Sequence, residues 1–180
     1  MNPKFSTGQI LSAVFVAVSV SSAVYISVAA VNYLNFFPAL AQLSSRVTSV
    51  GFVNASSGPS LSARVDVSNP SDYSGFKVAD LSLKLYFGHS NASTTQTLFQ
   101  DNPLFGLAVP NRDLGPRSSL FSLLNIMLNS QQLASLSDFN RTYYGQISAH
   151  VVLTVDIRTF LDPVIGVTVL NIAQDLSLSS

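Results

Sequence analysis

From Phe5 through Ser45 the chain has no charged side chain. Within this stretch, Ile10 to Val31 is a run of 22 residues made only of Val, Ala, Ser, Ile, Leu, Phe and Tyr. A helix of that length spans roughly 33 Å, which matches a hydrocarbon core of about 30 Å. We therefore expect one transmembrane helix at residues 10–35.

The predicted helix carries small residues on which another helix can pack. They are Ser12, Ala13, Ala17, Ser21 and Ala29. Small side chains let helix backbones approach closely in a membrane, so two arrangements are open: a lone anchor, or an anchor that contacts neighbouring copies. The serines do not exclude a membrane location, because a helical hydroxyl can bond to a backbone carbonyl one turn earlier.

The charges around the helix indicate its orientation. Lys4 precedes it and Arg46 is the first charge after it, which favours a cytoplasmic N-terminus. We expect residues 1–9 to be a cytoplasmic tail, 36–45 a linker and 46–180 an extracytoplasmic domain. A cleavable signal peptide is the alternative, since Ala39-Leu40-Ala41 has the small-x-small form. The apolar run, however, exceeds the about 7 to 15 residues of the apolar region inside a usual signal peptide.

Three sequons agree with an exported domain. Asn54, Asn91 and Asn140 each begin an N-x-S/T triplet without proline at x, whereas Asn69 is followed by Pro70 and does not qualify. These three asparagines are candidate N-glycosylation sites in a host that has the machinery.

The region after the helix is rich in patterns typical of β-strands. Leu61 to Ser68 and Leu81 to Phe87 have apolar residues at every second position, as in strands with one buried and one solvated face. Turn-forming residues separate them, and His89-Ser90-Asn91 is expected at the next corner. Further strands are expected at 47–53, 94–99, 104–109, 146–157 and 164–173, with a turn at Asp162-Pro163. This predicts a mainly β, immunoglobulin-like antiparallel sandwich.

One stretch has helical rather than strand-like spacing. Its apolar residues are Leu120, Leu123, Leu124, Met127 and Leu128. Ser118 or Ser119 is a suitable N-cap, so we expect a short amphipathic helix over about 120–133 that closes one end of the sandwich.

Several segments of this region resemble a known family. Val65-Asp66-Val67-Ser68-Asn69-Pro70, Phe76-Lys77-Val78 and the strand from Leu81 to Gly88 are similar to the signature of the group 2 late embryogenesis abundant proteins, also called the water stress and hypersensitive response domain. The resemblance covers about residues 46–175. It implies a seven-stranded sandwich with a short helix, often behind a membrane helix, and a non-catalytic role in desiccation or envelope stress. It supplies no catalytic residues.

The sequence lacks the residue patterns of common catalytic and metal sites. His89 and His150 are far apart along the chain with no carboxylate adjacent to either, and Asp66, Asp72 and Asp80 lack the spacing of a calcium loop. We interpret Asp66 as lying on the solvated face of its strand and Asp72 as a turn residue. No cysteine is present, and net charge is zero, without the basic excess that phosphate binding needs. We expect no enzyme activity, cofactor, metal or nucleic-acid partner.

The combined pattern predicts a non-enzymatic, single-pass cell-surface protein whose sandwich binds an envelope component or protects against stress. Its expected partners are the lipid bilayer or neighbouring copies through the helix, and another copy or an envelope protein through the domain. The alternative is a subunit of an extracellular filament, similar to the type IV pilins of archaea, with helices bundled in the core. Against it, Lys4-Phe5 does not form the usual pilin processing site. A strand-donating filament, with 174–180 or the segment after the helix as donor, is a third possibility.

Overall fold

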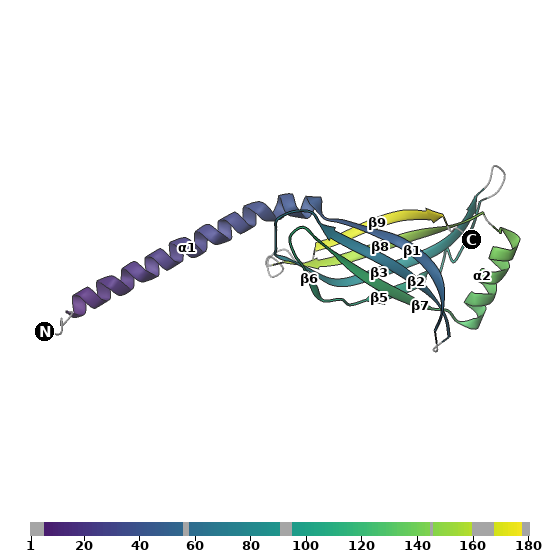
Figure 1. Cartoon of the computed structure of the whole chain (residues 1–180), viewed down its shortest axis with the longest axis horizontal. Helices are drawn as coiled ribbons and strands as arrows, with labels where there is room; N and C mark the ends of the chain where they lie inside the picture. The colour runs from purple at the N-terminus through teal and green to yellow at the C-terminus, as the bar shows by residue number, and fades with distance from the viewer. Residues whose placement is uncertain (1–5, 56–57, 91–94, 145, 160–167, 178–180) are drawn as a thin grey trace. The chain divides into compact units, whose positions relative to one another are not determined.

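The computed structural model describes residues 6–55, 58–90, 95–144, 146–159 and 168–177 (Figure 1). The chain divides into two compact units, Met1–Ala41 and Gln42–Ser180. We call the second unit the head.

The first unit is formed by helix α1, Thr7–Gln42. It is long and apolar enough to cross a membrane, and none of its most apolar stretch is buried within the protein. The Ser27 hydroxyl donates to the carbonyl of Ala23 at 2.8 Å, which is the back-bonding expected of a helical serine. The helix is longer than predicted: residues 36–42, expected to be linker, continue it past Pro38, because Ala39-Leu40-Ala41-Gln42 are strong helix formers.

The head is a two-sheet β-sandwich with one short helix, as the sequence predicted (Figure 1). The first sheet has the antiparallel order β1-β2-β7, with bounds β1 Ser44–Ala55, β2 Gly58–Asn69 and β7 Ser118–Met127. The second has the order β4-β3-β8-β9, with β3 Phe76–Ser90, β4 Thr95–Leu98, β8 Ile147–Arg158 and β9 Thr168–Ser177. Two more short strands, β5 Leu104–Ala108 and β6 Arg112–Leu114, pair with β3 beside β4.

Alternating side chains of the central strands fill the space between the sheets. The fully or almost fully buried ones include Ala63, Val65 and Val67 of β2, Leu81, Leu83 and Leu85 of β3, and Val151, Leu153 and Val155 of β8. Burial of each of these Val and Leu side chains stabilises the fold by about 1.5–3 kcal/mol. The two strands with clear alternation in the sequence are therefore confirmed as half-buried strands.

A side-chain amide joins the two sheets on one side of the head. The backbone N–H of Val47 donates to Oε1 of Gln174 at 3.1 Å, and Nε2 of Gln174 donates to the carbonyl of Val47 at 3.0 Å. Val47 lies in β1 where the register to β2 shifts, and Gln174 lies in β9 of the other sheet. The amide thus satisfies backbone groups that the irregular ladder leaves open.

The prediction of a helix at residues 120–133 is wrong. Residues 118–127 form strand β7, and the helix α2, Ser130–Thr142, begins later. Its N-cap is Asn129, whose side chain accepts from the N–H of Gln132 at 2.8 Å, rather than Ser118 or Ser119. The error arose because both faces of β7 are apolar: Leu124 and Ile126 are buried while Leu123 is exposed, so the alternation was hidden.

Three further expectations concern the corner at His89, the turn at Asp162-Pro163 and the C-terminal segment. The corner predicted at His89 is wrong, since β3 continues through Ser90 and His89 pairs with Gln96 and Ile147. The turn at Asp162-Pro163 and the beginning of the strand predicted at 164–173 lie outside the described residues. The segment 174–177, one predicted donor, is paired with β8 of its own chain.

Candidate functional site

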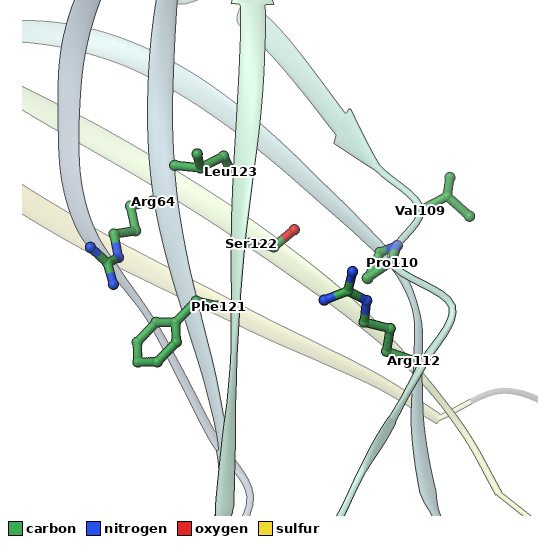
Figure 2. A pocket seen from close by; sticks show the side chains of 7 residues that line it. All are labelled: Arg64, Val109, Pro110, Arg112, Phe121, Ser122 and Leu123. Carbon is green, nitrogen blue, oxygen red and sulfur yellow. The ribbon is translucent and has the colours of Figure 1, made fainter.

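A pocket of about 510 Å³ opens beside the middle of β7 (Figure 2). Its lining residues are Arg64 of β2, Phe121, Ser122 and Leu123 of β7, and Val109, Pro110 and Arg112 around the start of β6. Figure 2 shows Arg64 and Phe121 on one side of β7, with Ser122, Pro110 and Arg112 on the other. The pocket therefore borders the edge of β7, between the first sheet and the segment that joins β5 to β6.

Two arginines give the pocket a positive character. The guanidinium carbon of Arg64 lies 4.8 Å from the ring centroid of Phe121, a cation–π arrangement. In the described part of the chain, neither Arg64 nor Arg112 has a carboxylate within ion-pair distance. Arginine beside exposed aromatic and aliphatic surface is typical of protein interaction surfaces. The geometry favours binding over catalysis.

The Asn69-Pro70 segment, on which the family resemblance rests, forms a hydrogen-bonded turn at the end of β2. The buried Asn69 amide donates to the carbonyls of Tyr73 at 2.8 Å and Gly115 at 2.9 Å. Its Oδ1 accepts from the N–H and hydroxyl of Ser71 at 3.1 and 2.6 Å. Asn69 therefore fixes the loop after β2 against the turn before β7.

An exposed ion pair supports the same turn. Arg117 contacts Asp72 at 2.7 Å, and its N–H donates to the carbonyl of Ser71 at 2.9 Å. Asp72 is thus a turn residue, as predicted. Burial raises the pKa of the Tyr73 phenol above its ordinary value. This end of the head is a structural site built from polar side chains.

The two histidines have different surroundings. His89 is buried, its Nδ1 lies 3.1 Å from the carbonyl oxygen of Gln146, and its ring stacks on Tyr143. His150 is partly exposed and its Nδ1 lies 2.5 Å from Oδ1 of Asp175. A carboxylate therefore neighbours His150 in space although none does in the sequence, because β9 pairs with β8.

Asp66 has different surroundings from those expected of it. Asp66 is buried and contacts Arg46 at 3.5 Å, so the expectation that it is solvated is wrong. Its cross-strand neighbours are Arg46 of β1 and Phe121 of β7. Among the described residues, no group of three His, Cys, Asp or Glu side chains is placed to hold a metal ion.

The remaining sequence-predicted residues are placed as follows. The small residues Ser12, Ala13, Ala17, Ser21 and Ala29 are all exposed on α1. Asn54 lies in β1, Asn140 is exposed on α2, and Asn91 lies outside the described residues. Glycosylation at these positions and helix packing stay predictions.

Comparisons with known proteins find likeness in fold. No family model matches the chain, and no curated protein matches it. A crystal structure from Archaeoglobus fulgidus aligns over 77% of this chain and 97% of its own, with 13% identity and a TM-score of 0.43. The solution structure of a protein described as late embryogenesis abundant aligns over 91% of this chain and 88% of its own, with 17% identity and a TM-score of 0.38. A β-glucosidase from Paenibacillus barengoltzii aligns over 73% of this chain but 13% of its own, with 13% identity and a TM-score of 0.32.

The pocket was not found from the sequence. Arg64 and Arg112 belong to different strands, and only the fold brings them to the same edge. The available signal was the apolar, uncharged run over Ser118–Met127, which was interpreted instead as part of an amphipathic helix at the end of the sandwich.

Proposed function

We propose that the chain is a non-enzymatic, single-pass envelope protein whose head is held outside the membrane by α1 and binds another envelope component. The observation that carries this proposal is α1 itself. Its 36 residues carry no charge, and its most apolar stretch has no burial inside the protein, so a membrane is the environment that removes this surface from water. The first strand of the head, β1, begins a single residue, Leu43, after the end of α1.

A binding role is supported by the surface of the head. The pocket beside β7 combines exposed Phe121, Leu123 and Val109 with the guanidinium groups of Arg64 and Arg112. The sequence resemblance adds an expectation of stress protection in the envelope.

The test is alkaline extraction of membranes combined with mass spectrometry of the intact chain. We expect a chain that retains Met1 and stays with the membrane after extraction. A chain that begins at Gln42 and appears in the soluble fraction would show that residues 1–41 are a cleaved signal peptide, and the proposal would fail.

A filament subunit is the second candidate, and the length of α1 favours it. At 36 residues the helix extends about 54 Å, well beyond the about 30 Å hydrocarbon core, so part of it lies outside a bilayer or packs on other helices. Ala13, Ala17 and Ser21 follow each other at i,i+4 and form one row for such packing. Electron microscopy of a detergent-free surface fraction tests this candidate: filaments whose chain is cut between Phe5 and Gln9 would support it, and their absence would reject it.

A further inference from the structure

The strand edges of the head differ in how they are protected against pairing with other chains. In the second sheet, one edge consists of three short strands, β4, β5 and β6, which each pair with a part of β3. At the edge of the first sheet, β1 has a register shift and receives the amide of Gln174. Short edge strands, bulges and covering side chains are the devices by which natural sheets avoid edge-to-edge association.

Strand β7, at the other edge of the first sheet, is neither short nor bulged. Its ten residues, Ser118–Met127, contain no charge and no proline, and they pair with β2 without a register shift. Among the described residues, no strand pairs with its second edge. The pocket beside Ser122 shows that this edge is reached by solvent (Figure 2). A long, regular, uncharged edge of this kind is a template for strand addition.

Apolar side chains flank the edge on both sides. Strand β5 of the second sheet lies next to β7, and a Cβ on its Gly106 would meet the side chain of Ile126 at 3.0 Å. Among the described residues of the head, ten large apolar side chains are exposed. Six of them belong to this edge, each between 53% and 64% exposed: Phe105, Leu107, Val109, Phe121, Leu123 and Met127. Side chains of this size leave roughly 600 Å² of apolar surface in water, at the upper limit of what a typical monomer exposes.

We propose that β7 pairs antiparallel with β7 of a second copy of this chain across a two-fold axis. The sheet β1-β2-β7 then continues into the same sheet of the partner, and the flanking apolar rows of the two copies meet. With the polar backbone edge included, the total buried area approaches the roughly 800 Å² per partner of a standard interface.

The occupant is a second copy for two reasons. In the described part of the head, six of the ten exposed large apolar side chains lie along this edge, so the same edge of another copy is the surface that best covers them. The chain also has zero net charge, so two copies do not repel each other over long distances. The pairing involves the head alone and stands whether α1 is an anchor or a filament core.

The absence of cysteine makes a direct test possible. Single cysteines are placed at Phe121, Leu123 and Asn125, which share the outward face of β7, and at Val169 of β9 as a control that is 49% exposed on a different edge strand. The full-length chain is oxidised in detergent micelles and the disulfide-linked dimer is measured. Opposed residues on paired strands have Cβ atoms about 4.5–5.5 Å apart, within reach of a disulfide after a small shift. We expect at least one β7 position to give roughly tenfold more dimer than Val169→Cys.

A charge on the edge gives the second measurement. Leu123→Lys, combined with the cysteine at Asn125, should abolish the cross-link by repulsion across the axis, whereas Val169→Lys in the same background should not. Mixing Leu123→Lys with Leu123→Asp chains, each with the cysteine at Asn125, should restore it as a heterodimer. Because Leu123 is 64% exposed, these variants should keep the circular dichroism of the unmodified head.

Three results would overturn the proposal. The first is an equal yield of disulfide-linked dimer from Val169→Cys and from the β7 cysteine variants. The second is a dimeric chain in which no β7 cysteine forms a cross-link. The third is a cross-link at Asn125→Cys that persists in a folded chain carrying Leu123→Lys.

Discussion

Replacing Asn69 with alanine tests whether the turn at the end of β2 holds the head together. The substitution removes four hydrogen bonds, to the backbone of Tyr73, Gly115 and Ser71 and to the Ser71 hydroxyl. Each is worth about 1 kcal/mol net, and some of the freed groups regain water, so the free energy of unfolding should fall by about 2–4 kcal/mol. Urea unfolding of the full chain in detergent micelles, followed by near-ultraviolet circular dichroism of tyrosine, measures this.

Two further variants sharpen the result. Asn125→Ala removes the same side chain from an exposed position of β7 and should cost less than about 0.5 kcal/mol. Asn69→Asp keeps the acceptor for Ser71 but loses both donors and buries a charge, so it should also be destabilised. If Asn69→Ala unfolds within about 0.5 kcal/mol of the unmodified chain with the same dependence on urea, the turn is not a stabilising element and our reasoning is refuted.

Three other outcomes follow from contacts in the head. Burial raises the pKa of the Tyr73 phenol above 10.0, so the folded state keeps a proton that the unfolded chain loses at high pH. The free energy of unfolding should therefore fall as pH rises above 10. Urea titrations should show a smaller fall in the Tyr73→Phe variant than in the unmodified chain. Gly106→Ala should lower stability by about 1 kcal/mol, because the new methyl group meets Ile126, whereas Gly51→Ala, with open space around it, should show no such loss in thermal unfolding. Gln174→Leu should speed hydrogen exchange at the Val47 amide, and unchanged exchange in the folded variant would show that the Gln174 bridge does not protect it.

The fold class was predictable because the strands that form the centre of the sandwich carry the clearest pattern. Leu81, Leu83 and Leu85 alternate with polar residues, and the structure buries all three. The alternation of apolar and polar residues did not identify β7, because the exposed Leu123 lies between Ser122 and the buried Leu124. The resulting spacing of apolar residues resembles that of a helix. A strand can be recognised in the sequence when apolar residues lie on one face only. It cannot be recognised in this way when, as in β7, apolar residues lie on both the buried and the exposed face.

The candidate site was less predictable than the fold. Arg64 and Arg112 are ordinary surface charges in the sequence, and no spacing rule relates them. They border the same pocket because β2 and β6 belong to different sheets that meet beside β7. The His150–Asp175 contact was missed for the same reason, since it depends on the register between β8 and β9.

The position of β1 directly after α1 has a mechanical consequence. Any pull transmitted through the helix reaches the first strand of the head at Ser44, and β1 pairs with β2 from Ser44 to Ala55. When the opposing load acts at the far end, where α2 follows β7, the force runs along the strands and perpendicular to the ladder bonds. These bonds then share the load in shear rather than breaking one after another. The Gln174 bridge at Val47 lies near the loaded end, so the head is reinforced where tension arrives.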